Sequence, residues 1–194
     1  MVRTGNESLF LGMSELENPW KTLGGKKIYE NAWIRLDEYD VINPKGGKGI
    51  YGKVSFKGAA VGVIPIDEEG NTWLVGQYRY TLEEYSWEIP MGAADFDEDP
   101  EVGGLRELRE ETGLLASKME QLMKIHTSNS VTDEVGFVYL ATQLEQGMPE
   151  FDDTEDITIK KLPFVEALQM VLDGQITDSL SVAGILKLAR IRGL

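Results

Sequence analysis

The clearest pattern of hydrophobic and polar positions lies in the first half of the chain, where two apolar segments flank a polar turn. Residues 59–66 are almost entirely apolar, and residues 72–78 are rich in aromatic and aliphatic side chains. Between them, residues 67–71 read Asp-Glu-Glu-Gly-Asn, the composition of a tight turn. The pattern predicts a buried strand that returns through this turn into a second strand, and we expect the main core to begin here.

Three segments before this pair also have the composition of strands. Residues 26–29, 33–41 and 49–56 alternate or run in β-branched and aromatic residues, and the turn at 43–47 contains a proline and two glycines. They predict a small antiparallel sheet that precedes the core. Residues 1 to about 24 show no sustained period, and we expect a mobile or partner-docked arm.

The second half of the chain mixes helical and strand patterns. A glycine-opened acidic loop, residues 92–99, leads into a helix predicted from Pro100 to Thr112. Asp99 can cap the start of this helix, and Gly113 can adopt the left-handed conformation that ends many helices. The other expected elements are strands at 118–125, 135–142 and 158–161, a helix at 163–172 closed by Gly174, and a last helix from a cap at Asp178 to Arg192.

The composition narrows the class of protein. The chain has 194 residues, of which 42% are hydrophobic, enough for one domain with a full core and a small appendage. It has no cysteine, which excludes disulfides, a thiol nucleophile and zinc sites built on sulfur. No apolar run suffices for a signal peptide or a membrane span, so we expect a soluble cytoplasmic protein with no membrane partner. The formal net charge of −14 argues against a nucleic-acid polymer as partner, whereas a small anionic substrate carried by metal ions is compatible with it.

The candidate chemistry is concentrated on the predicted helix. Glu107, Glu110 and Glu111 stand at i, i+3 and i+4, so their side chains share one face. One interpretation is a solvated acidic face, because charge runs are usually surface features. The other is a site for Mg²⁺ or Mn²⁺, because three close carboxylates repel one another and offer the oxygen ligands these cations prefer. Gly103 and Gly104 each cost about 0.5–1 kcal/mol relative to alanine, and close packing of the helix on a sheet would explain them.

A longer motif around this helix resembles the signature of the Nudix hydrolases, Gly-x5-Glu-x7-Arg-Glu-U-x-Glu-Glu-x-Gly-U, in which U is aliphatic. The resemblance implies hydrolysis of a nucleoside diphosphate linked to another group, with divalent metals held by the carboxylates of the helix. Every fixed place of the signature is filled. The matching residues are Gly92, Glu98, Arg106, Glu107, Leu108, Glu110, Glu111, Gly113 and Leu114.

The segment before the signature resembles one branch of this family, which acts on ADP-ribose and nucleotide sugars. It reads Gln-Tyr-Arg at residues 77–79 and Trp-Glu-Ile-Pro at residues 87–90. The resemblance implies that Arg79 contacts substrate phosphate, which a guanidinium can bind through two oxygens. Glu88 is a further candidate substrate-binding residue. The alternative for Arg79 is a surface ion pair with Glu83 or Glu84.

The predicted N-terminal sheet also resembles that branch, several members of which dimerise through such a sheet, often with exchange between protomers. The resemblance implies a homodimer formed through residues of about 26–56. We expect Trp33 or another N-terminal aromatic residue to reach the nucleotide base in the partner's site. The sheet also has strand edges that need covering.

The polar segment between the predicted strands at 118–125 and 135–142 has the composition of a functional loop. Members of the ADP-ribose branch place a catalytic glutamate here, after Ser-Pro-Gly. This chain has Ser-Asn-Ser at 128–130 instead, so the loop shape and the choice of substrate are left open. The resemblance implies Glu134 as general base, since a loop carboxylate can stay free of metal. The alternatives are that Asp133 or Glu110 is the catalytic base, or that Glu134 is a plain loop charge. We interpret His126, the only histidine, as structural.

We therefore expect an α+β protein, with a Nudix α/β/α sandwich and mixed central sheet in residues 58–194 and an N-terminal arm and antiparallel β appendage in residues 1–57. The expected reaction is metal-dependent cleavage of the pyrophosphate bond of ADP-ribose or another nucleoside diphosphate sugar, giving a nucleoside monophosphate and a sugar phosphate. Two rivals remain: a Nudix enzyme acting on nucleoside triphosphates or RNA 5′ ends, and a non-catalytic nucleotide sensor.

The resemblance also implies roles for the signature residues. Glu107 and Glu111 are the first metal ligands, and Glu110 shares metal or water. The carbonyl of Gly92 or Ala93 completes the shell. Arg106 is a catalytic-site residue that steadies the carboxylates, and Glu98 supports the loop. We interpret the acidic run 145–156 as an exposed loop.

Overall fold

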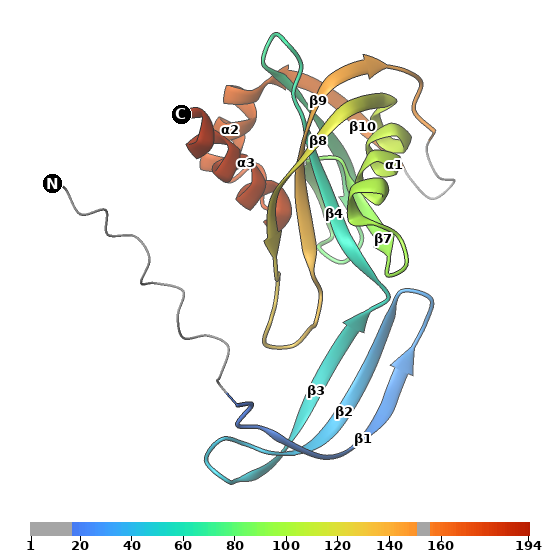
Figure 1. Ribbon diagram of the computed structural model, residues 1–194, viewed down its shortest axis with the longest axis vertical. Coiled ribbons are helices and arrows are strands. Elements are labelled where there is room, and N and C mark those ends of the chain that lie inside the picture. The colour runs from blue at the N-terminus through green and yellow to red at the C-terminus, as the bar shows by residue number, and fades with distance from the viewer. Residues whose placement is uncertain (1–16, 151–155) are drawn as a thin grey trace, which may run out of the picture.

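The N-terminal part of the chain forms a separate antiparallel sheet in the computed structural model, which describes residues 17–150 and 156–194 (Figure 1). The turn at 43–47 forms as predicted, because Asn43 Oδ1 accepts hydrogen bonds from the backbone of Lys45 and Gly47, and Gly46 has φ +83°. The predicted arm lies mostly outside the described residues, and its last residues belong to β1 instead. The strands, in spatial order, are β1 (Lys21–Glu30), β2 (Ile34–Ile42) and β3 (Lys48–Phe56).

The main body is built around seven further strands of the described chain, arranged as two sheets. A four-stranded sheet has the order β7-β4-β9-β8, and a three-stranded sheet has the order β10-β5-β6. β4 and β9 are parallel, whereas β4 pairs with β7 and β9 pairs with β8 in antiparallel fashion, so the expected mixed sheet is confirmed. The strands are β4 (Gly58–Pro65), β5 (Asn71–Arg79), β6 (Glu84–Glu88), β7 (Met91–Asp95), β8 (Leu114–Ile125), β9 (Gly136–Gln146) and β10 (Thr158–Pro163).

Three helices of the described chain cover the body from two sides. α1 (Pro100–Thr112) lies on one side of the four-stranded sheet, and α2 (Phe164–Leu172) and α3 (Ser179–Arg192) lie on the other (Figure 1). Successive side chains of β4 point to opposite faces, so Val63 packs with Leu108 of α1 while Ile64 joins the cluster containing Ile185 of α3. The expected α/β/α sandwich is confirmed. No helix within the described residues is long and apolar enough to cross a membrane.

The predicted glycine-opened loop before α1 was partly wrong. Met91–Asp95 is strand β7, which pairs with β4 so that Val61 faces Gly92 and Ala60 faces Ala93. Small residues have weak strand propensity on their own, and here the neighbouring strand determines the conformation. β8 also begins earlier than predicted, at Leu114, directly after the helix.

The two glycines inside α1 are explained by close packing, as the sequence suggested. A Cβ at Gly103 would lie 2.7 Å from the Cβ of Ala94 on β7, too close for two rigidly held carbons. A Cβ at Gly104 would lie 3.2 Å from Val63 on β4. The glycines bring α1 close to the strand that carries Gly92 and Ala93.

Candidate active site

Helix α1 begins and ends at the predicted residues and thereby fixes the candidate carboxylates. Asp99 accepts a hydrogen bond from the backbone of Glu101 at 2.9 Å, and Pro100 occupies the first turn. Gly113 has φ +74°, and its N–H donates to the carbonyl oxygen of Arg109 at 2.8 Å. Both ends of the helix are therefore held by local interactions.

Glu107 and Glu111 are held against the strand that precedes the helix. Glu111 is 1% exposed, and its Oε2 accepts a hydrogen bond from the backbone N–H of Met91 at 2.8 Å. A Cβ at Gly92 would overlap the carboxylate of Glu107. The glycine that opens the signature thus leaves room for a signature carboxylate, a requirement that the sequence pattern does not explain by itself.

Arg106 connects the carboxylates of the helix face. Its Nη1 donates to Glu107 at 2.8 Å and to Glu110 at 3.0 Å. Its Nη2 donates to the carbonyl oxygen of Ala93 at 2.8 Å and to Glu98 at 3.3 Å. Partial burial lowers the pKa of the Arg106 guanidinium, but the hydrogen bonds and charges of the glutamates outweigh it and raise that pKa overall. Arg106 is thus placed to hold these groups together, and its part in catalysis stays a prediction.

Arg79 and Glu88 form a two-pronged ion pair, in place of the alternative pair with Glu83 or Glu84. Arg79 Nε donates to Glu88 Oε1 at 2.8 Å, and Nη2 makes a second, short hydrogen bond to Oε2. Glu88 is 2% exposed, whereas the Arg79 side chain is 36% exposed. The contact with Glu88 raises the pKa of Arg79 further. Glu88 therefore fixes the orientation of the Arg79 guanidinium, and its direct contact with substrate stays a prediction.

The structure brings the predicted site residues except Glu88, which lines neither, to two adjoining cavities. Both cavities have a volume of about 310 Å³, and both are bordered by Trp33, Gly92 and Ala93. Glu134 lines the second, together with Phe56 and Ala60 among others. The first is also lined by Gln77, Arg79, Met91, Arg106, Glu107, Glu110, Glu111 and Glu150.

The sheet pairing explains how Glu134 comes near the signature residues. Ala60 of β4 pairs with Ala93 on one side and with Gly136 on the other, and Glu134 lies just before that glycine. Glu134 accepts a short hydrogen bond from the Thr127 hydroxyl, and its own N–H donates to Thr132 Oγ1 at 3.0 Å. The carboxylate is thus held by a neutral donor within its own loop.

His126 lies at the start of the same loop. It is exposed, and its Nδ1 lies 3.1 Å from the carbonyl oxygen of Glu134. This contact lies within the loop, and the structural interpretation of the histidine stays a prediction.

The loop also contacts the N-terminal sheet. Asp133 forms an ion pair with Lys53 at 2.6 Å and accepts a hydrogen bond from Ser55 at 2.8 Å. Burial raises the pKa of Asp133, but the hydrogen bonds from Lys53 and Ser55 outweigh it and lower that pKa overall. The two adjacent acidic residues of the loop therefore have different surroundings: Asp133 is held by β3, and Glu134 lines the second cavity.

The donor set around α1 suits a divalent cation. Carboxylates of Glu107, Glu110 and Glu111 and the carbonyl of Ala93 are oxygen donors, which Mg²⁺ and Mn²⁺ prefer. Within residues 17–150 and 156–194, no group of three acidic, histidine or cysteine side chains is already gathered as a metal site. Arg106 instead bridges Glu107 and Glu110. The residues therefore fit such an ion by their chemistry, in an arrangement organised here by Arg106.

Glu150 lines the first cavity, although the sequence pattern identified it only as part of an exposed acidic loop. Its N–H donates to the carbonyl oxygen of Glu110 at 2.8 Å, and its carboxylate pairs with Arg109 at 3.3 Å. Close packing of Gly113 on Gly147 brings this segment to the end of α1. Residues 151–155 of the predicted acidic loop lie outside the described residues. Since the approach depends on tertiary packing, composition alone could not reveal it.

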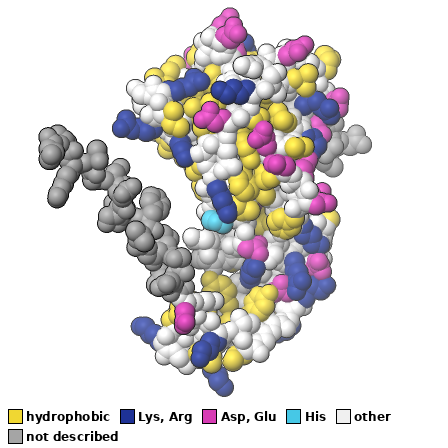
Figure 2. Space-filling model, in the orientation of Figure 1, with side chains coloured by type: hydrophobic (Ala, Val, Ile, Leu, Met, Phe, Trp, Pro, Cys, Tyr) yellow, Lys and Arg dark blue, Asp and Glu magenta, His cyan; other side chains and the backbone are white. Residues whose placement is uncertain are grey.

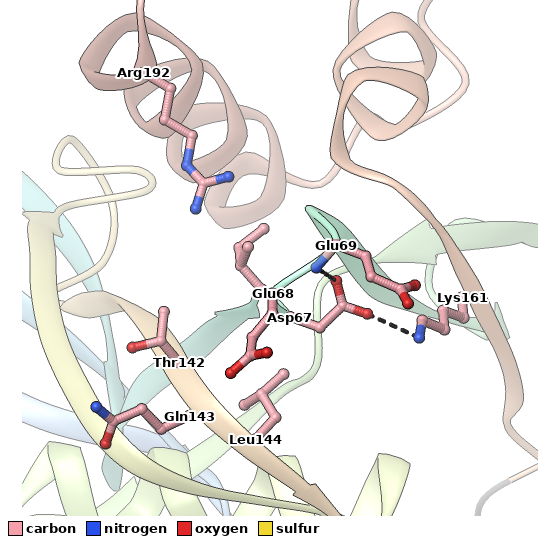
Figure 3. Close-up of a pocket in the computed structure, with 9 residues that line it drawn as sticks. Asp67, Glu68, Glu69, Thr142, Gln143, Leu144, Lys161 and Arg192 are labelled. Atoms are coloured by element: carbon pink, nitrogen blue, oxygen red, sulfur yellow. Dashed lines mark hydrogen bonds and ion pairs between the residues drawn. The ribbon is translucent and has the colours of Figure 1, made fainter.

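A larger hollow of about 540 Å³ lies away from these residues. It is bordered by Asp67, Gln143, Lys161 and Arg192, and the Asp67–Lys161 ion pair of 2.8 Å spans part of it (Figure 3). None of the predicted site residues lines this hollow. Its size alone therefore gives no reason to place the chemistry there.

Comparison with known proteins agrees with the geometry around α1. The family model described as the NUDIX domain matches residues 56–178. The ADP-ribose pyrophosphatase of Mycobacterium tuberculosis is 38% identical over 173 residues, which cover 88% of this chain and 83% of that protein. The methanol dehydrogenase activator of Bacillus methanolicus is 35% identical over 167 residues, 85% of this chain and 90% of the relative. A crystal structure of an ADP compounds hydrolase matches 93% of this chain and 98% of its own, with a TM-score of 0.81 at 19% identity.

Proposed function

The chain belongs to the Nudix hydrolase family, and we propose that it cleaves the pyrophosphate bond of a nucleoside diphosphate linked to a sugar, with ADP-ribose as the first candidate. The products would be a nucleoside monophosphate and a sugar phosphate. The observation that carries the proposal is the gathering of Arg79, the three glutamates of α1 (Glu107, Glu110 and Glu111) and Glu134 around two adjoining cavities. The name of the M. tuberculosis relative supports the choice of substrate.

The proposal assigns the negative face of α1 to a divalent cation, Mg²⁺ or Mn²⁺. Glu107, Glu111, Glu110 and the Ala93 carbonyl would hold it, and when bound it would neutralise diphosphate charge and acidify a water molecule. Arg106 keeps the glutamates together before the ion arrives. The positive charge of a bound cation would explain why a surface so rich in carboxylates can accept an anionic substrate.

Arg79 is assigned to a phosphate oxygen of the substrate. Its ion pair with Glu88 uses Nε and Nη2, so Nη1 is the donor that we assign to phosphate. Glu88 is buried, and it fixes the plane of the guanidinium so that less side-chain freedom is lost on binding. The exposed ring of Trp33, 74% accessible, is assigned to stacking on the nucleotide base.

Glu134 is assigned as the general base that takes a proton from the attacking water. Its carboxylate is half-buried, lines the second cavity, and keeps one hydrogen bond from Thr127. A carboxylate that does not bind the metal keeps its lone pairs for the proton. Transfer of that proton to Glu134 leaves a hydroxide equivalent that attacks phosphorus and expels the other phosphate as leaving group.

A substrate screen tests the proposal. ADP-ribose, ADP-glucose, GDP-mannose, UDP-glucose and nucleoside triphosphates are incubated with Mg²⁺ or Mn²⁺, and phosphate is measured after phosphatase coupling. We expect turnover of ADP-ribose by the wild type and by Glu166→Gln, an exposed substitution on α2, and near-complete loss in Glu111→Gln. Preferred turnover of triphosphates would favour the alternative, a Nudix enzyme that acts on nucleoside triphosphates or RNA 5′ ends.

A second candidate function comes from the B. methanolicus relative, whose name is that of an activator of another enzyme. A pure activator would need no intact hydrolytic site. Absence of turnover for every compound in the screen, with the wild type no more active than Glu111→Gln, would favour it.

We also propose a homodimer formed through the N-terminal sheet, with Trp33 or another N-terminal aromatic residue reaching the nucleotide base in the partner's site. Support comes from the exposed apolar side chains of this sheet, which include Leu23, Ile28 and Ile50. In the single chain, Trp33 borders the cavities of its own protomer. Binding to RNA stays disfavoured by the net charge, and the cytoplasmic location stays a prediction.

A further inference from the structure

The loop that carries Glu134 is fastened to the N-terminal sheet, and we propose that Asp133 and Lys53 are positioning residues that hold Glu134 for proton abstraction. The inference rests on the proposed function, because it presupposes that Glu134 acts as the base. It assigns to the N-terminal sheet a role in catalysis within one chain, separate from dimerisation. Figure 1 shows the β8–β9 connection reaching down to β3.

The backbone makes the first set of contacts. Val54 of β3 and Thr132 of the loop form an isolated parallel bridge. The N–H of Val54 donates to the carbonyl oxygen of Val131 at 2.9 Å, and the N–H of Asp133 donates to the carbonyl oxygen of Val54 at 3.2 Å. These bonds fix the direction of the loop along β3, but they use backbone groups that any residue except proline would supply.

The side chain of Asp133 makes the second set of contacts, which depends on this particular sequence. Lys53 and Ser55 lie on the same face of β3 and reach its carboxylate at 2.6 Å and 2.8 Å. The backbone N–H of Phe56 completes the set at 3.4 Å. Three donors from one strand thus converge on one carboxylate.

Because Glu134 directly follows Asp133 in the chain, the contacts that hold Asp133 also restrict where Glu134 lies. Glu134 is held on its other side by Thr127, whose hydroxyl donates to the carboxylate, and by Thr132, which accepts from its N–H. Loss of the Asp133 side-chain contacts would leave the loop held to β3 by its backbone bonds and by the Tyr51 hydroxyl, which donates to the carbonyl oxygen of Ser130 at 2.7 Å, with no side-chain contact to β3 next to Glu134. A displacement of about 1 Å at a reacting group can cost about a hundredfold in rate.

The ion pair alone is not enough to fix the loop. The side chains of Lys53 and Asp133 are both 41% exposed, and an exposed pair contributes little because water screens it. The hydroxyl and the backbone donor add geometric restriction to the charge. We therefore expect a graded effect, larger on removal of the shared acceptor than on removal of one donor.

The variants Asp133→Ala, Lys53→Met and Lys53→Arg test the proposal. We expect Asp133→Ala to lower kcat for ADP-ribose about tenfold and Lys53→Met about threefold, with KM changed less than twofold. Lys53→Arg keeps the charge and a donor and should stay near wild type. The matched control is Lys26→Met, which removes a similar exposed pair with Glu38, at 2.9 Å, on the same sheet but away from the loop; it should leave kcat unchanged.

A KM increase with unchanged kcat would overturn the proposal, because the loop contacts would then serve substrate binding. Equal losses of kcat in Lys53→Met, Lys53→Arg and Lys26→Met would also overturn it, since the effect would follow general damage to the sheet. A fall in melting temperature that accounts for lost activity would have the same meaning.

Hydrogen–deuterium exchange separates this proposal from the proposed function. Asp133→Ala should speed amide exchange in segment 128–134 and leave α1 unchanged, whether or not any substrate is turned over. If the wild type turns over no compound in the screen but exchange responds as expected, the proposed function fails while the fastening stands. If turnover is normal and exchange in the loop does not change, the fastening is refuted and the proposed function is untouched.

Discussion

At the scale of single residues, the carboxylates of the site differ in what surrounds them. Glu111 is buried and accepts a hydrogen bond from the backbone N–H of Met91, and the carboxylate of Glu107 packs against Gly92. Glu110 shares one nitrogen of Arg106 with Glu107, whereas Glu134 meets a neutral hydroxyl. The three helix carboxylates can offer oxygens to one cation from a single face, whereas Glu134 approaches from a separate loop.

We predict that Glu111→Gln nearly abolishes metal-dependent turnover while the fold is kept. Glutamine is nearly isosteric and can still accept the bond from Met91, but the loss of one charge weakens binding of a dication. Melting temperature without metal should hold or rise, because repulsion on the helix face falls. Activity and Mn²⁺ titration measure the effect; full activity, or wild-type activity undiminished in excess chelator, would contradict the metal assignment.

We predict that Glu134→Gln lowers kcat by about 10²–10⁴-fold, the usual contribution of general-base catalysis, with little change in KM or metal affinity. The amide cannot accept the proton from water. Glu120→Gln, an exposed glutamate on β8, is the control and should behave as wild type. A tenfold loss of metal affinity would instead place Glu134 among the ligands.

We predict that Gly92→Ala impairs turnover about as strongly as loss of a ligand, on the order of a hundredfold, because geometry at a reacting centre is so exacting. The new methyl group would occupy the space of the Glu107 carboxylate. Gly49→Ala, where a Cβ would meet nothing within 4 Å, is the control. The measurement is kcat together with metal affinity, and retention of both would show that Glu107 is not needed where it lies.

At the scale of elements, α1 could be predicted residue by residue because its limits depend on local chemistry. An aspartate cap, a proline in the first turn and a left-handed glycine act within a few residues of the helix ends. Strand β7 could not be predicted in this way, because its small residues become a strand only beside β4. Local signals are therefore reliable where the stabilising partners are close in sequence.

The same distinction applies to the candidate site. The signature and the loop glutamate were identified from the sequence, and the structure brings both to adjoining cavities. The partner of Arg79 was missed, since the pairing of β5 with β6 puts Glu84 opposite Arg79 and Glu88 opposite Val75, so the contact depends on how the two side chains lie and not on the strand register. Asp133 likewise finds Lys53 across a large separation in the sequence. Pairings of this kind depend on tertiary structure.

The turn between β4 and β5 gives a prediction for pH dependence. Asp67 accepts hydrogen bonds from the backbone of Glu69 at 3.0 Å and Asn71 at 2.7 Å, and it pairs with Lys161 (Figure 3). Burial raises the pKa of Asp67, but the bonds from Lys161 and Asn71 outweigh it and lower that pKa from 3.8 to about 2. Because the folded-state pKa is depressed, the stabilisation is present above pH 3.8 and is lost as the pH falls through about 2.

We therefore expect Asp67→Asn to lower the free energy of unfolding by about 1 kcal/mol at pH 7, since it removes a charge-assisted hydrogen bond. The difference from wild type should shrink as the pH falls below about 4. Urea unfolding at pH 7, 4 and 3 measures it, with Glu68→Gln, an exposed neighbour, as control. A difference that stays constant with pH would show that the charge does not stabilise the turn.

At the scale of the whole molecule, the surface is acidic in sum but not uniform. On the face shown in Figure 2, acidic and basic side chains are interspersed, and hydrophobic side chains reach the surface over the N-terminal sheet as well as over the main body. Ile50 on β3 is 67% exposed. An apolar patch on a small sheet is the kind of surface that a second copy covers.

We predict that the protein is a dimer through residues of about 26–56, and that Ile50→Lys shifts it towards monomer. A charge in an apolar contact must be desolvated, which opposes association. Leu172→Lys on α2, where the native leucine is 63% exposed, is the matched control and should leave the mass unchanged. Sedimentation equilibrium measures the mass, and a monomeric wild type would refute the dimer.

The parallel pairing of β4 with β9 has a consequence for the order of events during synthesis. Ala60 pairs with Gly136, so the segment enclosed by this pairing contains Arg79, β7 and the whole of α1. A nascent chain can form the capped helix early, because its contacts are local, but it cannot place Glu134 until β9 has left the ribosome. The acidic helix is therefore made before Glu134 can be placed beside it, and the site can be completed only after β9 has been translated.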